Sequence, residues 1–355
     1  MGYSSFFFTS FFLLLAVVTK EEPLVPALFI FGDSIVDVGN GNNLPSIAKA
    51  NFLPYGRDFV THTPTGRFSN GKLTIDFASE IVGFASYQPA YLNLKVKGKN
   101  LLNGANFASY GTGYHQSTAT LYRTLSLNQQ LIYYSDCQKE LVKAVGQSSA
   151  SSIIADAVYV VVAGTGDFAQ NYYLNPFLNK VFTHDQFSNI IIQCYSNFIQ
   201  KLYALGARKI AVSTLPPIGC LPFIITLFSP HSNKCVEMLN NVAIDYNIKL
   251  NSTSEKLLKM LPNLNLVILD IYEPLYKLIT KPTDYGFFES RKACCATGLI
   301  EIAIFCNQKS IGTCANASEY VFWDGYHTSQ AANKFLFDHV IPIFSSLINT
   351  NRTLL

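Results

Sequence analysis

The chain has 355 residues, of which 49% are hydrophobic and 14% are charged, and its formal net charge is +3 at pH 7. This length allows a full hydrophobic core, while the small net charge and the lack of any lysine or arginine cluster argue against a nucleic-acid partner. Because soluble proteins usually carry about 25% charged residues, we expect some of the 27 phenylalanines and 20 tyrosines to lie at the surface or in a substrate channel.

The first 22 residues are typical of a secretory signal peptide. Residues 6–18 are apolar except for Thr9 and Ser10, and the first charges follow at residues 20–22. The run is shorter than the roughly 20 apolar residues that cross a bilayer. No basic residue precedes it, so a buried strand or a membrane anchor is the alternative. We predict a secreted, extracellular protein without a transmembrane anchor, in which residues 23–355 form one domain.

The cysteines and the glycosylation sequons agree with the secretory route. There are eight cysteines, and an even number in a secreted chain favours disulfides. They lack C-x-x-C pairs and zinc-type Cys/His spacing, so we expect no metal site. Four of them fall between positions 294 and 314, so we expect disulfides to staple that loop, with every pairing left open. Sequons for N-glycosylation begin at Asn251, Asn316 and Asn351.

Four short apolar runs, rich in β-branched residues, predict buried strands of a parallel sheet. They cover residues 27–31, 158–163, 209–214 and 265–271. Helical spacing of apolar residues predicts three helices between or after these strands. They cover residues 187–205, with Asp185 as the cap and Gly206 as the stop, residues 235–260, and a last helix from about Thr328.

Strands that alternate with helices predict an α/β fold with a parallel sheet and right-handed crossovers. In such sheets, functional groups gather at the carboxyl ends of the strands. Three segments stand at such ends, namely Gly32–Ser34, Gly164–Asp167 and Asp270.

Ser34 is the candidate nucleophile at the first of these strand ends. The strand ends at Phe31, Gly32 permits a tight turn, and Ser34 is expected to open the next helix with its hydroxyl exposed at the sheet edge. At a helix N-terminus, its backbone N–H could donate to an oxyanion. The alternative is a serine that only caps the helix, the commonest use of serine at such a position.

The second feature is the segment Trp323-Asp324-Gly325-Tyr326-His327. A serine becomes a good nucleophile when a base takes its proton, and a histidine acts as that base when a carboxylate fixes its tautomer. Asp324 and His327 lie three residues apart and can make this contact within one turn. The alternative is a surface loop with a solvated histidine, although the five other histidines stand in less organised settings.

Together these features resemble the plant secreted branch of the GDSL lipases and esterases, within the SGNH-hydrolase superfamily. The resemblance covers nearly the whole mature chain and rests on an ordered series of motifs rather than on any one of them. The motifs are Phe31–Asn40, with Ile35 in place of the family's leucine, Pro54–Phe59, Thr65–Lys72, Asn103–Ser109, Leu215–Cys220 and Lys292–Cys295.

The resemblance implies a flavodoxin-like three-layer α/β/α sandwich with a mostly parallel sheet. It implies that Ser34 attacks an ester carbonyl, that His327 accepts and returns the proton, and that Asp324 orients His327. The backbone N–H groups of Ser34 and Gly111 would face the oxyanion, where each lost donor can cost roughly 10²–10³ in rate. The implied activity is hydrolysis of carboxylic (acyl or lipid) esters through an acyl-serine intermediate, without a cofactor.

The chain departs from the family pattern at three positions. Gly166 replaces the asparagine of the G-x-N-D motif, the third oxyanion donor of the family. This leaves open a slower enzyme, a substitute donor such as water or Thr165, or a loss of catalysis, while the retained Asp167 is expected to be structural. Tyr110 replaces a glycine, which can reshape the pocket, and Thr328 replaces a proline and can still cap the last helix.

Two other functions stay open. A catalytically silent protein that binds lipids or wall polymers would fit Gly166 and the many aromatic residues, and an acyltransferase would use the same three residues with another alcohol in place of water. A dinucleotide fingerprint over Gly164–Ala169 is rejected, because no strand pattern ends at Asp185, where its acidic residue would stand. The G-x-S-x-G elbow of α/β-hydrolases is absent, and the pattern leaves the oligomeric state open.

Overall fold

The computed structural model describes residues 22–46, 48–93, 96–175 and 177–348. Almost all of the predicted signal peptide lies outside these residues, as does Asn351, so both stay predictions. Among the described residues, none of the helices combines the length and the apolar character needed to span a bilayer.

Four parallel strands form the sheet, in the order β1 (Leu28–Gly32), β2 (Val158–Val162), β3 (Lys209–Ser213) and β4 (Asn265–Leu269). Each strand lies within two residues of its predicted bounds. β1 and β2 are buried along their whole length, which explains why apolar residues fill them without alternating with polar ones.

Residues 103–109 extend the sheet beyond β1, although no strand was predicted there. The Ile30 N–H donates to the carbonyl of Ala105 at 3.1 Å, and the Phe107 N–H donates to the carbonyl of Ile30 at 2.8 Å. Ile30 thus uses its N–H and its carbonyl to bond two residues of the same neighbouring segment, Ala105 and Phe107, as in a parallel pair of strands. Counted as the second strand, this segment gives the 2-1-3-4-5 order of flavodoxin-like sheets.

Ten α-helices are present among the described residues. They are α1 (Thr74–Ile81), α2 (Gln116–Tyr122), α3 (Leu127–Val145), α4 (Gln147–Asp156), α5 (Leu178–Val181), α6 (His184–Ala204), α7 (Pro222–Phe228), α8 (Glu237–Met260), α9 (Tyr272–Thr280) and α10 (Gln330–Ser345). A π-helical segment, η3 (Asp167–Tyr172), follows β2. As predicted, α6 ends just before Gly206, whose φ is +102°.

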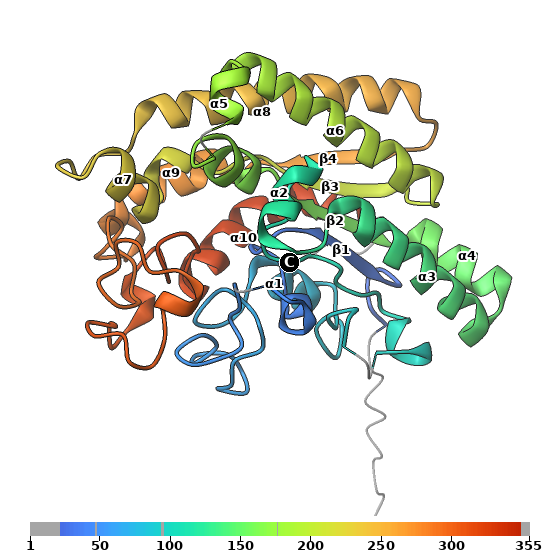
Figure 1. Cartoon of the computed structure of the whole chain (residues 1–355). Coiled ribbons are helices and arrows are strands. Elements are labelled where there is room, and N and C mark those ends of the chain that lie inside the picture. Colours follow the sequence, from blue (N-terminus) through green and yellow to red (C-terminus); the bar gives the residue numbers. More distant parts are fainter. Residues whose placement is uncertain (1–21, 47, 94–95, 176, 349–355) are drawn as a thin grey trace, which may run out of the picture.

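The helices cover both faces of the sheet, as Figure 1 shows. Phe29 and Phe31 of β1 pack in the core that contains residues of α3, α6 and α8. Leu28 and Ile30 pack in a second core that contains residues of α1 and α10. Successive side chains of a strand point to opposite faces, so the sheet separates two apolar layers. The predicted three-layer α/β/α sandwich is confirmed.

Two predicted helix caps are wrong. α6 is capped by Thr183, whose hydroxyl accepts the N–H of Gln186 while the Gln186 side chain accepts the N–H of Thr183. This reciprocal capping box satisfies two N–H groups, so Asp185 is left in the first turn, where a negative charge suits the helix dipole. α10 is capped by Ser329 rather than by Thr328.

Six of the eight cysteines form disulfides. Two of these bonds, Cys294–Cys314 and Cys295–Cys306, staple the loop in which the sequence predicted them. The third, Cys220–Cys235, connects the 3-10 helix Ile218–Cys220, which precedes α7, to the segment before α8. Cys137 on α3 and Cys194 on α6 are free thiols, so the even number of cysteines does not reflect complete pairing.

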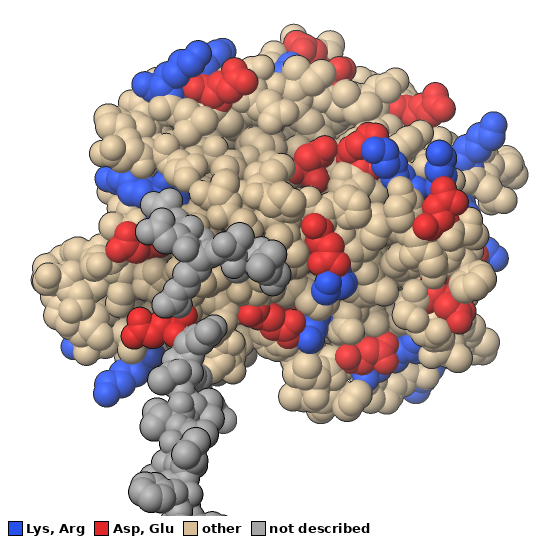
Figure 2. All heavy atoms as spheres, turned by 180° about the vertical axis from the view of Figure 1, so that it is seen from behind, with Lys and Arg blue, Asp and Glu red and all other residues tan. Residues whose placement is uncertain are grey.

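The described surface carries few charges. On the face seen in Figure 2, acidic and basic side chains are interspersed, without a large patch of either sign. Asn251 on α8 and Asn316 just before residues 317–319 are exposed, so both sequons are accessible. Glycosylation at these positions stays a prediction.

Candidate active site

Ser34 follows the carboxyl end of β1, at the edge of the sheet where the sequence predicted it. Gly32 has a φ of +141°, and a Cβ atom there would lie 1.9 Å from the carbonyl oxygen of Val162. The turn out of β1 therefore requires glycine. Ser34 lies in a tight turn, and the first helical element after β1 is the short 3-10 helix Asn40–Asn43. The prediction that Ser34 opens a helix is wrong.

The fold brings Ser34, Asp324 and His327 together, although the serine and the histidine are 293 positions apart. Nε2 of His327 lies 2.8 Å from Oγ of Ser34, and Nδ1 lies 2.9 Å from each carboxylate oxygen of Asp324. All three residues are at most 5% exposed. In this geometry Nε2 can accept the serine proton while the carboxylate holds the Nδ1 proton.

The Asp324 carboxylate is held by several donors besides the imidazole. Its Oδ1 accepts the backbone N–H of Tyr326 at 2.9 Å and that of His327 at 2.8 Å. Its Oδ2 accepts the hydroxyl of Tyr55 at 2.7 Å. The Trp323 N–H donates to the carbonyl of His327 at 2.7 Å and closes the turn. The predicted local contact between aspartate and histidine is therefore held by the backbone of its own segment.

Asp37 fixes the segment that leads to Gly111. Its Oδ2 accepts the backbone N–H of Tyr110 at 3.0 Å. Its Oδ1 accepts the N–H groups of Gly39 at 2.7 Å and Asn40 at 2.8 Å. One buried carboxylate thus ties the loop after Ser34 to the loop that contains the predicted oxyanion glycine.

Gly111 occupies a position that only glycine fits. Its φ is +74°, and a Cβ atom there would lie 2.7 Å from Cβ of Tyr122. Among the described residues, neither the Gly111 N–H nor the Ser34 N–H has a hydrogen-bond acceptor. Both groups are free to meet a ligand, and their role as oxyanion donors stays a prediction.

An amide side chain lies beside Gly166, although the expected asparagine is absent. A Cβ atom at Gly166 would lie 3.3 Å from Oε1 of Gln170 and 3.4 Å from the carbonyl oxygen of Thr112. Gln170 stands four residues later on η3 and is buried. The side-chain amide of Gln170 therefore lies next to the position that the family asparagine would occupy.

Asp167 has a structural setting, as expected from the sequence. Its carboxylate accepts the backbone N–H groups of Tyr114 at 2.6 Å and His115 at 3.1 Å, and the hydroxyl of Thr118. It therefore anchors the start of α2 to η3. The described residues from η3 to β3 contain helices and turns only, so no strand leads to Asp185 as a dinucleotide-binding unit would need.

A mostly apolar cavity lies beside the triad. His327 and Ile35, the residue after Ser34, are part of its lining. The rest of the wall comes mainly from apolar side chains of α1, β2, β4 and α10. They include Ile75, Ala78, Val162, Leu269, Phe337 and Val340. The cavity thus borders the triad through His327 and through Ile35, the neighbour of Ser34.

Three buried carboxyl groups near the site bind protons more tightly than usual. Burial raises the pKa of Asp33 to about 7, with smaller contributions from the neighbouring carboxylates. Burial also raises the pKa of Asp37 to about 6 and that of Asp167 to about 7. Removing a carboxylate from water disfavours its charged form, so the folded protein binds these protons at a pH where the unfolded chain has released them.

We expect this excess proton binding to make the protein less stable as the pH rises. For Asp33, the stabilisation is complete below its ordinary pKa of 3.8 and is lost as the pH rises through about 7. Between these two pH values, the free energy of unfolding falls by about 1.4 kcal/mol for each pH unit. Asp33→Asn keeps an oxygen to accept the Ile35 N–H but cannot titrate. Urea unfolding at pH 5 and pH 8 should therefore show a smaller pH difference in the variant, and equal differences would contradict this assignment.

Several residues of the site were not predicted as site residues. Tyr55 lies in the Pro54–Phe59 motif, but nothing in that motif indicates a contact with Asp324, 269 positions later. Asp37 lies in the motif that contains Ser34, and an aspartate there is also typical of a turn. Gln170 carries no motif at all. Within the described residues, no group of three His, Cys, Asp or Glu side chains is arranged to hold a metal ion.

A three-layer α/β/α fold with a hydrogen-bonded Ser–His–Asp arrangement at the edge of its sheet has the architecture of a serine hydrolase. A protein-family profile described as GDSL-like Lipase/Acylhydrolase matches residues 28–340. The chain therefore belongs to the GDSL esterase/lipase family, a family of carboxylic ester hydrolases.

Relatives from Arabidopsis thaliana match this chain over nearly their full length. GDSL esterase/lipase At5g22810 is 57% identical over 340 residues, which cover 95% of this chain and 94% of that protein. GDSL esterase/lipase At5g03820 is 52% identical over 336 residues, which cover 93% of this chain and 95% of that protein. GDSL esterase/lipase APG is 49% identical over 336 residues, which cover 92% and 95% of the two chains.

Proposed function

We propose that this protein is an extracellular hydrolase of acyl or lipid esters that works through an acyl-Ser34 intermediate. The observation that carries the proposal is the 2.8 Å contact between Oγ of Ser34 and Nε2 of His327, with Nδ1 held by Asp324. Three disulfides and two exposed sequons support the extracellular setting.

The triad performs ester hydrolysis in two half-reactions. Oγ of Ser34 forms a bond to the carbonyl carbon as its proton passes to Nε2 of His327. The bond to the leaving alcohol then breaks, and His327 gives this proton to the departing oxygen. Water attacks the acyl-enzyme carbon while its proton passes to Nε2, and the acid is released as Ser34 regains a proton. Asp324 stabilises the imidazolium in both steps.

The negative oxygen that develops on the substrate needs donors. The free N–H groups of Ser34 and Gly111 are the candidates for this role. Gly166 cannot supply the third donor of the family, and the amide of Gln170 lies beside it. We therefore propose an enzyme that is slower than a family member with the asparagine, by up to roughly the 10²–10³ that one donor can contribute.

The apolar cavity indicates where the acyl chain binds. Its lining includes residues of α1 and α10 that are mostly apolar. Burying a methylene group there contributes about 0.8 kcal/mol, so affinity should rise with acyl length until the cavity is filled. This favours acyl or lipid esters over small polar esters as substrates.

Filling the cavity should shorten the longest acyl chain that the enzyme accepts. Val340 lines the cavity and is 6% exposed, so Val340→Phe places a ring in the space proposed for the chain. On p-nitrophenyl esters of increasing length, we expect kcat/KM to fall at least about tenfold for the longest chains and little for acetate. Each methylene left in water raises the barrier by about 0.8 kcal/mol.

A matched control for this prediction lies on the same helix. Ile343 is 40% exposed and is not part of the cavity lining, so Ile343→Phe adds the same ring outside it. The control should keep the chain-length profile of the wild type. Identical profiles for all three proteins would show that acyl chains bind elsewhere.

The proposed chemistry is tested by labelling with a fluorophosphonate probe, which reacts with activated serines. We expect a single adduct that peptide mapping places on Ser34. A folded protein without label at Ser34 would contradict the proposal.

A second candidate function is favoured by Gly166. Without the family asparagine, the protein could bind lipids or wall polymers without turning them over, in which case wild type and a Ser34→Ala variant would hydrolyse esters equally slowly. An acyltransferase is the closer variant, since it differs only in the alcohol that attacks the acyl-enzyme. Product analysis in the presence of glycerol or a sugar distinguishes transfer from hydrolysis.

A further inference from the structure

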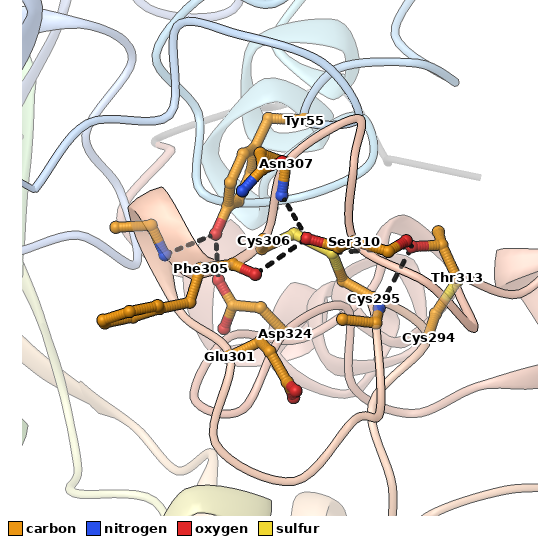
Figure 3. The surroundings of a disulfide bond; sticks show 12 residues. Tyr55, Cys294, Cys295, Glu301, Phe305, Cys306, Asn307, Ser310, Thr313 and Asp324 are labelled. Carbon is orange, nitrogen blue, oxygen red and sulfur yellow. Dashed lines mark hydrogen bonds between the residues drawn. A yellow bond between two sulfur atoms is a disulfide. The ribbon is translucent and has the colours of Figure 1, made fainter.

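The hydroxyl of Tyr55 connects the triad carboxylate to a disulfide-stapled loop. It donates to Oδ2 of Asp324 at 2.7 Å and accepts the backbone N–H of Ala303 at 2.9 Å. Tyr55 is fully buried, as is Asp324. Figure 3 shows the phenol between Asp324 and the loop that contains Cys295 and Cys306. The phenol thus has one partner in the triad and one in this loop.

Ala303 lies in a loop that a disulfide closes. Ala303 begins the 3-10 helix Ala303–Phe305, which Cys306 follows directly. The bond between Cys295 and Cys306 closes the loop around it. Ala303 itself has a φ of +51°, a left-handed conformation that costs a residue with a Cβ atom free energy and persists only where the surroundings impose it.

The same loop also holds the backbone on both sides of Asp324. The Cys295 N–H donates to the carbonyl of Trp323 at 2.8 Å, before the aspartate. The Gly325 N–H, after the aspartate, donates to the carbonyl of Glu301 at 2.8 Å. The loop therefore contacts the triad segment through its backbone and, by way of Tyr55, through the carboxylate.

The Tyr55 hydroxyl donates to Oδ2 of Asp324, the carboxylate oxygen to which no described backbone N–H donates. Oδ1 of Asp324 accepts two backbone N–H groups, whereas among the residues that the structure describes Oδ2 has only the phenol and the imidazole as partners. Burial, together with the charge of Asp324, raises the pKa of Tyr55 well above its ordinary value of 10. The phenol therefore keeps its proton, and remains a donor, at neutral pH.

We propose that Tyr55 is a positioning residue of the triad, which fixes Oδ2 of Asp324 toward His327 and is itself held by the loop closed by Cys295 and Cys306. The inference rests on the proposed function of the triad and adds a residue and a disulfide to it. Tyr55 is not part of the cavity lining, so its effect falls on proton transfer rather than on substrate binding.

The sharpest test is Tyr55→Phe, which removes one oxygen from a buried ring. A hydrogen bond to a charged group is worth enough to change kcat by about 10- to 100-fold, and KM should stay the same. A carboxylate that has lost a donor is more basic and favours the imidazolium. The acid limb of the kcat/KM profile and the titration midpoint of the His327 ring, followed by NMR, should therefore move to higher pH.

Two neighbouring tyrosines do not titrate in this test. Tyr110 and Tyr326 are buried, and burial raises the pKa of each well above the ordinary value. Both remain neutral over the pH range of the profile. Asp33, Asp37 and Asp167 also lie near the site, and burial raises their pKa values to about 7, about 6 and about 7. The NMR midpoint of the His327 ring, measured beside the acid limb, assigns the shift to the histidine.

Tyr195→Phe is the matched control. Tyr195 is a fully buried tyrosine whose hydroxyl bonds Ser254 on α8, outside the triad. It should lower the melting temperature as Tyr55→Phe does, but leave kcat and the acid limb unchanged. If Tyr55→Phe behaves in the same way, the phenol is only structural and the proposal is wrong.

The disulfide is tested by the pair Cys295→Ala and Cys306→Ala, with Cys294–Cys314 left intact. The double variant should have a lower kcat, and its acid limb should move to higher pH, as in Tyr55→Phe. It also keeps the proposal testable if Tyr55→Phe does not fold. In the Tyr55→Phe background the same pair should shift the acid limb no further, because contacts that act through one group are not additive. Additive shifts would show that the loop does not act through Tyr55.

Failure of the proposed function is distinguishable from failure of this inference. If wild type shows no turnover above Ser34→Ala, the proposed hydrolase activity is wrong, but the NMR titration of His327 still reads the effect of Tyr55. If wild type is active and the titration midpoint is the same in Tyr55→Phe, the positioning role is wrong and the hydrolase stands.

Discussion

Replacing Ser34 by alanine should lower kcat on p-nitrophenyl esters by roughly 10⁴- to 10⁶-fold, to a residual rate supplied by binding and the oxyanion donors. The reason is that Oγ of Ser34 is the atom that bonds Nε2 of His327 at 2.8 Å. Alanine removes this atom and leaves the cavity beside it unchanged. Substrate should still bind, so KM or the affinity for a non-hydrolysed ester analogue should change little.

Ser79→Ala is the control for this experiment. Ser79 is a buried serine on α1 whose hydroxyl bonds Gln88 and the carbonyl of Ile75, away from the triad. Its removal should leave both turnover and labelling by the fluorophosphonate probe at wild-type level. Equal turnover by wild type and Ser34→Ala would favour the silent binding protein over the enzyme.

Asp324→Asn should lower kcat by about 10⁴-fold while the protein stays folded. Oδ1 accepts two backbone N–H groups, so the asparagine oxygen is expected to keep that place and the amide NH₂ to replace Oδ2. The amide then donates to Nδ1 of His327, which forces the ring proton onto Nε2. A protonated Nε2 cannot accept the proton of Ser34, so the base is lost although the ring stays in position.

Asp338→Asn is a matched control, because Asp338 is an exposed carboxylate on α10 that pairs with Lys334. Such surface pairs contribute about 1 kcal/mol or less, so the control should retain full activity. A fall in activity of less than tenfold in Asp324→Asn, with an unchanged melting temperature, would show that the aspartate does not set the histidine tautomer.

Those parts of the fold that depend on local pattern were predicted well. Residues 158–162 and 210–212 are apolar because these strands are covered on both faces, so composition alone indicates them. Residues 103–109 were missed as part of the sheet. Their backbone joins the edge of β1 through only a few hydrogen bonds, and their side chains include polar Asn103 and Asn106, which carry no strand pattern.

The capping residues of α6 and α10 could not be predicted from residue type alone. Asp185 and Thr183 are both acceptable caps by residue type. The choice of Thr183 depends on Gln186, which returns a hydrogen bond to its backbone. Likewise, Thr328 and Ser329 are adjacent candidates, and Ser329 caps α10.

By itself, the sequence determined the fold class, the four main strands, and the residue types and local spacing that a serine, an aspartate and a histidine need for acyl transfer. Tertiary structure decided which distant groups meet: the phenol of Tyr55 on Asp324, the amide of Gln170 beside Gly166, and the pairing of Cys295 with Cys306. The physical reason is that hydrophobic periodicity and turn chemistry act over a few neighbouring residues, whereas a hydrogen bond or disulfide between remote segments depends on how the whole chain packs.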